Sequence, residues 1–368
     1  MAGDEANRGG ILQSGVVNIG RLLVSIFVPA ITFLVLWGGF IFLRDSGAPQ
    51  VVITVVAILW GVGGVAALYL VASWMIYRLP IAWRKRFEPY LFVGPALIIL
   101  GWYIVLPTVR SLYLSFFDKY GEEFVGLTNY IYVFTNRTMI TAFRNNLLWL
   151  VFGTGLTVLL GLIVALLADR SKIERYAKSF IFLPMAISFI GAGIIWKFIY
   201  AVRPESSEQI GLLNAIITSL GGEPVNWLIM RPWNTFYLIF VLVWMQTGFA
   251  MVVLSAAIKG VPTALLEAAR IDGAKELRIV TSVIIPYIKG SIVTVSTTIL
   301  IITLKTFDVV YAMTQGLDGT EVLASQQYKQ MFKFFHYGRG SAIAIVILLA
   351  VIPVVFYNLR QFMRKEAF

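Results

Sequence analysis

The sequence predicts an all-α, polytopic membrane protein with about eight transmembrane helices. Of its 368 residues, 59% are hydrophobic and only 13% are charged, which is too little charge to cover the surface of a soluble protein. Apolar stretches long enough to cross a bilayer recur along the whole chain. The 30 Lys and Arg residues exceed the 19 Asp and Glu residues, which gives a net charge of +11, and the basic residues lie in short blocks between these stretches. That placement favours membrane topology signals over binding to nucleic acid.

Each candidate span provides the roughly 20 apolar residues that cross the hydrocarbon core as a helix. The first is too long for the apolar core of a signal peptide, so we predict a retained helix. A short connection, residues 44–50, joins it to the second span as a tight pair. The candidate spans are residues 22–43, 51–76, 90–112, 145–168, 178–200, 234–257, 288–312 and 341–362.

An even number of spans places both termini on one side of the membrane. Basic blocks flank the spans on that side, and an excess of Lys and Arg marks the cytoplasmic face. These blocks are residues 84–86 and the cluster of Arg170, Lys172, Arg175 and Lys178. The N-terminal segment 1–21 and the tail 363–368 are therefore predicted to be cytoplasmic. The outer segments, with a short helix expected over 211–220, are residues 113–143, 201–233 and 313–340.

Several chemical classes are excluded by composition. The chain has no cysteine, so it has no disulfide, no thiolate-bound zinc and no iron–sulfur cluster. His336 is its only histidine, and neither a glycine-rich phosphate loop nor a Ser/His/Asp set is present. We therefore expect no catalytic residue, no metal site and no cofactor on this chain.

The longest polar interruption in the second half predicts two short helices joined by a glycine; we call residues 262–286 the elbow. Pro262 suits a helix start, and Gly273 can take the positive φ that ends a helix. Glu267 and Arg270 are spaced to pair along the first helix. The first helix should expose one small apolar face, formed by Leu265, Ala268 and Ala269. The second should restart at Ala274 with Leu277, Val280 and Ile284 on one face, before Pro286 breaks the run.

This elbow resembles the EAA loop of the membrane subunits of ABC importers. That loop has a Glu-Ala-Ala triplet, a Gly four residues later and an Ile-x-Leu-Pro ending. Glu267, Ala268, Ala269, Gly273 and Pro286 hold their places, while Val283 and Ile285 replace the Ile and Leu. The resemblance implies that the elbow docks on an ATPase, with coupling residues Glu267, Ala268, Ala269, Asp272, Gly273 and Pro286.

From about residue 89 onward, the chain is similar to the membrane subunits of binding-protein-dependent sugar importers. Residues 107–116, 126–130 and 183–188 match their core spans and first outer loop. The two extra N-terminal spans resemble the maltose-transporter type, although the very large outer loop of the enterobacterial subunit is missing. The segment 306–360, with FDVVYAMTQG, GTEV and YGRGSAIA, is most similar to the α-glucoside and glucosylglycerol permease subunits.

The resemblance implies a type I ABC importer permease fold in a prokaryotic cell membrane. It divides the chain into an extra hairpin with a linker, residues 22–88, and a six-helix core, residues 89–362, containing the EAA loop 258–287. The implied partners are a second permease subunit, a dimer of cytoplasmic ATPases that hold ATP and Mg, and an extracytoplasmic sugar-binding protein, within membrane lipid. The cargo implied is a sugar, such as an α-glucoside disaccharide.

Polar residues inside spans usually face the bundle interior, because polar groups facing lipid are costly. Thr303 and Thr306 are expected on one helix face. In the sixth span, Gln246, Thr247 and Gly248 interrupt an apolar helix. The resemblance implies that Met185, Thr247, Gly248, Thr303 and Thr306 match positions that touch sugar in the maltose-type subunit, and that Ser188 belongs to the start of a span lining the pathway. The candidate pathway residues are therefore Met185, Ser188, Gln246, Thr247, Gly248, Thr303 and Thr306. The alternative is that these hydroxyls only bond the carbonyl four residues back or bridge helices.

Lys305 and Asp308 lie three residues apart at the outer end of the seventh span. They are candidates for an intrahelical pair that closes an outer gate. The alternative is an interfacial pair in which the Lys305 side chain extends to the headgroups.

Two other classes compete with the importer interpretation. An ion-coupled secondary transporter of a neutral solute would favour carboxylates at mid-span and often an internal repeat, neither of which this sequence shows. A membrane-embedded enzyme would need a catalytic cluster, whereas the one histidine stands alone.

Overall fold

The computed structural model describes residues 3–169, 171–204 and 206–366, and of some residues near the termini only the backbone. Helices dominate, and the one strand-like contact among these residues is an isolated bridge between Phe117 and Phe124. This confirms the predicted fold class. Contacts divide the chain into two compact units, residues 1–107 and 108–368.

The first unit contains α1 (Gly3–Asp45), α2 (Gln50–Tyr77), α3 (Ile81–Leu100) and the π-helical turn η1 (Gly101–Val105). The expected tight pair is present, because α1 ends at Asp45 and α2 begins at Gln50. The Trp60 indole N–H donates to the Leu36 carbonyl at 2.9 Å, which joins the two helices. The apolar side chains of this unit are largely exposed, as lipid-facing side chains would be.

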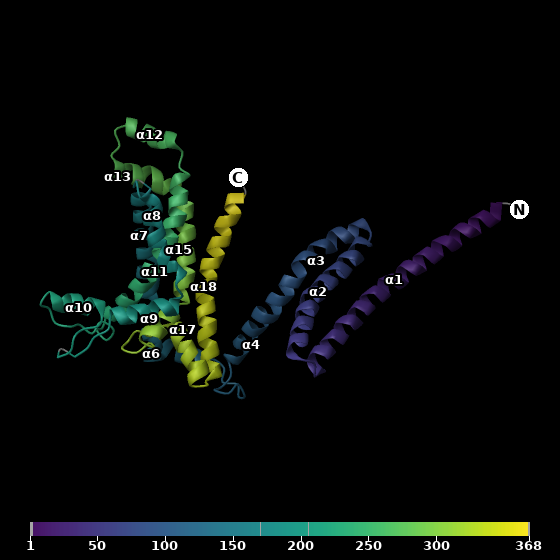
Figure 1. Cartoon of the computed structure of the whole chain (residues 1–368), viewed down its shortest axis with the longest axis horizontal. Helices are drawn as coiled ribbons and strands as arrows, with labels where there is room; N and C mark the ends of the chain where they lie inside the picture. Colours follow the sequence, from purple (N-terminus) through teal and green to yellow (C-terminus); the bar gives the residue numbers. More distant parts are fainter. Residues whose placement is uncertain (1–2, 170, 205, 367–368) are drawn as a thin grey trace. The chain divides into compact units, whose positions relative to one another are not determined.

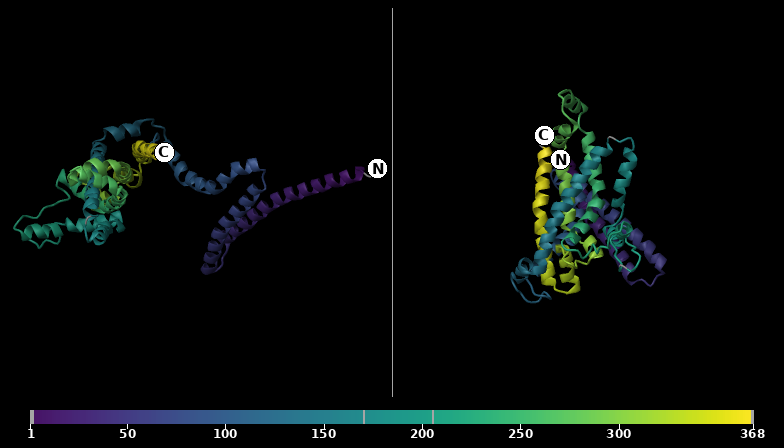
Figure 2. Two further views of the ribbon diagram at one scale, coloured as in Figure 1. Left: turned by 90° about the horizontal axis from the view of Figure 1, so that it is seen from above. Right: turned by 90° about the vertical axis from the view of Figure 1, so that its left-hand side faces the viewer.

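The second unit is a helical bundle with irregular outer segments (Figures 1 and 2). Its elements are α4 (Leu106–Leu114, which begins at the division), α5 (Thr128–Thr135), α6 (Arg137–Leu148), η2 (Trp149–Thr154), α7 (Gly155–Ala168), α8 (Glu174–Phe182), η3 (Leu183–Ala186), α9 (Phe189–Ile199), α10 (Leu212–Ser219), α11 (Trp233–Lys259), α12 (Thr263–Ile271), α13 (Glu276–Ile279), η4 (Val280–Ile284), α14 (Ile285–Tyr287), α15 (Lys289–Leu304), α16 (Asp308–Met313), α17 (Leu323–Tyr328), η5 (Lys329–Lys333) and α18 (Tyr337–Glu366). The short helix expected over 211–220 corresponds to α10.

Six helices in the described residues are long and apolar enough to cross a membrane, and two bent pairs raise the number to as many as eight. The prediction of eight apolar spans agrees with this, but two of them are not straight. Residues 178–200 bend by 102° between η3 and α9, where Pro184 lies in the 3-10 turn and Ser188 caps the next helix. The span expected over 288–312 follows a 73° bend and its helix ends early, at Leu304.

The core of the second unit is built around α11. Of its most apolar stretch 72% is buried, compared with 0% for the first span of the chain. Large side chains such as Leu238, Leu242 and Met245 are fully enclosed, and α7 and α15 pack along the same helix. A helix that is apolar all round is expected to occupy such a central position.

Candidate functional site

The elbow has the helix–glycine–helix geometry that its sequence predicts. The helix α12 follows Pro262, and Gly273 adopts φ +76°. The Gly273 amide donates to the Arg270 carbonyl at 3.0 Å, and the Ala274 amide donates to the Ala269 carbonyl at 3.0 Å. These two bonds end α12 through a left-handed residue. The second helix begins at Glu276, two residues later than expected, because Lys275 is extended.

Details of the elbow's side chains differ from the prediction. Arg270 approaches Glu276, with Nε 3.4 Å from Oε1, and Glu267 is exposed and forms no ion pair within the described residues. Leu277 and Ile284 do not share an environment, since Leu277 is 76% exposed and Ile284 is buried. The prediction that these residues share one face of the second helix is wrong, because the π-helical turn at residues 280–284 shifts the helical period.

One side of the elbow packs on the bundle and the other is open. Ala269 and Leu266 pack against a buried cluster formed by Val261, Ile279, Ile284 and Ile288. On the open side Ile271 is 85% exposed, and Leu265 and Ala268 are exposed as well. A hollow of about 790 Å³ at the joint is lined by residues of both helices and of the connection between them, among them Asp272, Gly273 and Arg278. Exposed aliphatic side chains on a polar connection indicate a surface that another protein covers.

A charge cluster, which we call the elbow-side charge cluster, lies at the end of α11, just before the elbow. We define it as Asp169, Glu174, Lys178, Ser255 and Lys259. The Lys178 ammonium contacts both Asp169 and Ser255, and it lies 2.6 Å from Glu174, which also pairs with Lys259 at 2.5 Å. Ser255 donates to Asp169 at 2.7 Å. The cluster ties together the ends of α7, α8 and α11 that lie on the side of the elbow.

The cluster was missed because its members are far apart in sequence. Lys178 was predicted only as part of a basic block that sets topology, although its spacing from Glu174 is that of a helical ion pair. Arg170, from the same basic block, lies outside the described residues.

Five of the seven predicted pathway residues lie on α11 or on the bent pair. Gly248 lies where α11 crosses the end of α8, and a Cβ there would be 2.5 Å from the Ile181 carbonyl oxygen. Its neighbours Gln246 and Thr247 are buried, and the Thr247 hydroxyl donates to the Val243 carbonyl at 2.6 Å. On the bent pair, Met185 is 40% exposed, and Ser188 accepts from the Gly191 amide at 3.1 Å as a helix cap.

Thr303 and Thr306 do not share a helix face, because α15 ends at Leu304. Thr303 is fully buried, and its hydroxyl donates to the Ile299 carbonyl at 2.7 Å, as the alternative interpretation expects. Thr306 lines a cavity of about 40 Å³ together with Lys305 and Asp308. This cavity is far smaller than the roughly 300–1,000 Å³ of a typical ligand site.

The expected intrahelical pair of Lys305 and Asp308 is not formed. Lys305 follows α15, whereas Asp308 begins α16, so the two residues are not on one helix. Neither takes part in an ion pair among the described residues. Their shared feature is the cavity, which Phe189 and Leu242 line as well.

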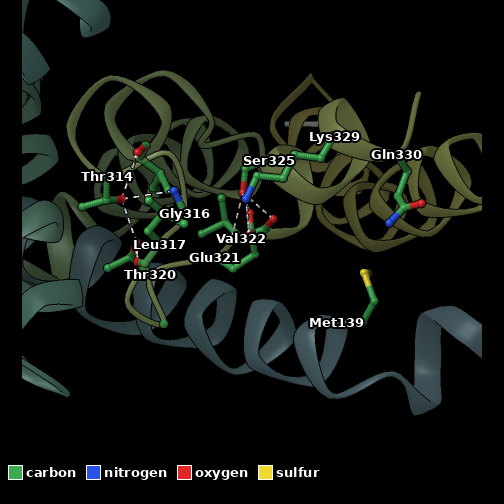
Figure 3. A network of polar contacts seen from close by, with 12 residues as sticks. Met139, Thr314, Gly316, Leu317, Thr320, Glu321, Val322, Ser325, Lys329 and Gln330 are labelled. Atoms are coloured by element: carbon green, nitrogen blue, oxygen red, sulfur yellow. Dashed lines mark hydrogen bonds and ion pairs between the residues drawn. The ribbon is translucent and has the colours of Figure 1, made fainter. Parts of the chain in front are cut away.

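A second polar network, which no sequence pattern predicted, holds the segment between α16 and α18, predicted to be an outer segment (Figure 3). Glu321 is buried, and its carboxylate contacts the Ser325 hydroxyl and lies 2.5 Å from the Lys329 ammonium. The Asn145 amide donates to the carbonyls of Gly319 and Glu321 at 2.6 and 2.8 Å. The segment is therefore anchored to α6 rather than being a loose loop.

A profile of the family described as "Binding-protein-dependent transport system inner membrane component" matches residues 157–366. The chain belongs to this family. It is thus a multi-pass permease subunit of an ABC-type transporter, and it is not itself an enzyme.

Relatives extend the match toward the N-terminus. The permease is 55% identical over 276 residues to "Osmoprotective compounds uptake permease protein GgtC" of Synechocystis, covering 75% of this chain and 99% of the relative. It is 48% identical over 280 residues to "Alpha-glucoside transport system permease protein AglF" of Rhizobium meliloti, covering 76% and 83%.

A solved structure shows the same fold. It is a bacterial alginate ABC transporter in complex with an alginate pentasaccharide-bound periplasmic protein. One of its chains aligns with a TM-score of 0.63 and 22% identity, covering 76% of this permease and 96% of that chain. The resemblance to ABC importer membrane subunits is therefore confirmed at the level of family and fold.

Proposed function

We propose that this permease subunit forms, with a second membrane subunit, the path by which an ATP-driven importer moves a neutral glycoside into a prokaryotic cell. An α-glucoside such as a disaccharide is the cargo we favour. A cytoplasmic ATPase dimer would hold ATP and Mg, and an extracytoplasmic binding protein would deliver the sugar. The relatives named for alpha-glucosides and for osmoprotective compounds support the cargo.

The observation that carries the coupling role is the pair of aliphatic side chains on either side of Gly273. Ile271 is 85% exposed and Leu277 is 76% exposed, although both lie in a polar connection between helices. Such side chains gain stability when a partner buries them. A short helix seated in an ATPase groove would move with that groove, and the cluster around Ile279 would pass the motion to the bundle.

The topology is part of the same proposal. The elbow lies at one end of the core and α17 at the other, and α18 ends on the side where α13 lies (Figure 1). We assign the elbow side and both termini to the cytoplasm, because the basic blocks flank the spans there. The functional division into residues 22–88 and 89–362 also stays a prediction.

We assign the pathway residues from the hydrogen-bonding chemistry of their side chains, and not from a sugar-sized cavity. Gln246, Thr247 and Thr306 are neutral hydrogen-bonding groups, which suit a polyol better than an ion. The cavity beside Thr306 is too small for a sugar, so transport requires a conformation in which the outer gap near Lys305 and Asp308 is open. Alternating access driven by the ATPase would supply that conformation.

The test is purification of the subunit from its native membrane in mild detergent, followed by uptake in liposomes. Co-purification of a second permease and an ATPase, with sugar uptake that needs ATP and the binding protein, is the expected result. A subunit that purifies alone and transports under an ion gradient without ATP would instead be a secondary transporter.

A further inference from the structure

Four aromatic rings form a continuous ladder at the end of the core opposite the elbow. We define the aromatic ladder as Phe307, Tyr311, Tyr328 and Phe332. The centroids of Phe307 and Tyr311 are 5.0 Å apart with nearly parallel rings, and Tyr328 lies 5.1 Å from the first and 5.2 Å from the second. Phe332 continues the ladder 5.4 Å from Tyr328.

The ladder joins the small cavity to the surface. Phe307 lines the cavity that also contains Thr306, Lys305 and Asp308. Away from the cavity, Tyr311 is 37% exposed and Phe332 is 58% exposed. The rings thus lead from an open face of the permease to the polar residues at the end of α15.

The ladder is held in place by the buried network around Glu321. Lys329, the residue after Tyr328, pairs with Glu321, and Ser325 on α17 contacts the same carboxylate (Figure 3). Gln330 donates to the Tyr132 hydroxyl at 3.1 Å, which fixes the following turn to α5. Rings positioned by such a network are preorganised for binding.

The chemistry of the ladder matches a sugar ring. A pyranose has an apolar face of C–H groups that packs on aromatic faces, and a rim of hydroxyls that needs hydrogen-bond partners. Tyr311 and Tyr328 combine an aromatic face with a hydroxyl, and Thr306, Lys305 and Asp308 lie at the end of the ladder. A lipid chain would not favour the charged groups at that end.

We propose that the aromatic ladder is a glycoside-binding platform, which receives the sugar at the outer face and passes it to the residues beside Thr306. The inference rests on the proposed import of a glycoside. It assigns a binding role to Tyr311 and Tyr328, which the pathway prediction did not include.

The test uses the importer assembled with its second permease, ATPase and binding protein in liposomes. Initial uptake of radiolabelled trehalose, sucrose and maltose is measured for Tyr311→Leu/Tyr328→Leu and for Tyr328→Trp. Leucine keeps an apolar side chain but removes the ring face. We expect the double variant to lower the uptake rate about tenfold, because each stacked contact contributes a fewfold change in binding. The tryptophan variant should keep most of the uptake.

The matched control is Phe334→Leu, an exposed aromatic residue of the same segment that lies outside the ladder, and its uptake should equal that of the wild type. Wild-type uptake by the double variant would overturn the inference alone. Loss of the second permease from the purified double variant would show that the ladder is a subunit interface and would also overturn it. A wild-type complex that takes up none of these sugars would overturn the proposed function and the inference with it.

Discussion

Replacement of Gly273 tests whether the backbone of the elbow sets the coupling geometry. A Cβ at this position would meet no atom within 4 Å, so the cost of a side chain comes from φ +76° and not from a clash. The left-handed region of φ/ψ costs an L-residue roughly 1–2 kcal/mol of conformational free energy, and it costs Asn less. Pro cannot adopt this φ, and it would also lose the Gly273 amide bond to Arg270, which adds about 1 kcal/mol.

These costs predict an ordered series. Gly273→Ala should shift the local opening equilibrium of the elbow about tenfold, since 1.4 kcal/mol corresponds to a factor of ten. Gly273→Asn should have a smaller effect, and Gly273→Pro should uncouple uptake from ATP hydrolysis or release the ATPase while leaving the subunit in the membrane.

Hydrogen exchange at the amide of Ala274 measures local opening. Co-purification of the ATPase and sugar uptake measure coupling. The matched control is Gly155→Ala, because Gly155 is helical and a Cβ there also meets no atom within 4 Å. Equal exchange in the Asn and Ala variants, or normal uptake with a bound ATPase in Gly273→Pro, would refute the reasoning.

Four further outcomes are expected. Leu277→Ser should reduce the amount of ATPase that co-purifies, while the thermal midpoint of the isolated subunit stays within a few degrees of the wild type, because this side chain is 76% exposed. An unchanged yield of ATPase would contradict this prediction. Lys178→Met should lower the stability of the subunit in detergent by about 1–3 kcal/mol, since it leaves the largely buried carboxylate of Asp169 without its cation while Glu174 keeps Lys259, and an unchanged thermal midpoint would disprove this. Thr306→Val should reduce sugar uptake severalfold and Thr303→Val should not, because of these two residues only Thr306 lines the cavity. Equal uptake by the two variants would show that lining the cavity does not matter for transport. Burial, helped by the nearby Arg339, lowers the pKa of His336 in the folded protein. The neutral imidazole therefore contributes folding stability that is present above pH 6.5 and is lost as the pH falls toward the folded-state pKa. Hydrogen exchange at the Arg339 amide, which donates to His336, should rise below pH 6.5 in the wild type but not in His336→Asn.

The elbow was predictable because its main features are local. Pro262 and Gly273 act through their own dihedral angles, so their positions in sequence determine where a helix begins and where it ends. The faces of the second helix were not predictable in the same way. A π-helical turn at residues 280–284 changes the period, and Pro286, which cannot donate to the Ser282 carbonyl, marks a disturbed helix there without specifying the kind of turn.

The pathway residues show a different limit. The prediction that Thr303 and Thr306 share a face assumed that the helix continues, but no glycine or proline marks its end at Leu304. The contacts that hold the outer segment join residues far apart, such as Asn145 with Gly319, and no single-sequence pattern encodes them. The bend before α9 could have been predicted, since Pro184 and the capping Ser188 are both visible in the sequence.

The position of α11 links the two ends of the proposed mechanism. It is a single helix from Trp233 to Lys259, about 40 Å long at 1.5 Å per residue, and its last residue belongs to the elbow-side charge cluster. Because its sides are closely packed, we infer that a displacement at the elbow tilts α11 as a unit instead of bending it. Such a tilt would move Gln246 and Thr247 relative to the bent pair that carries Met185, so that ATPase closure and access to the polar residues change together.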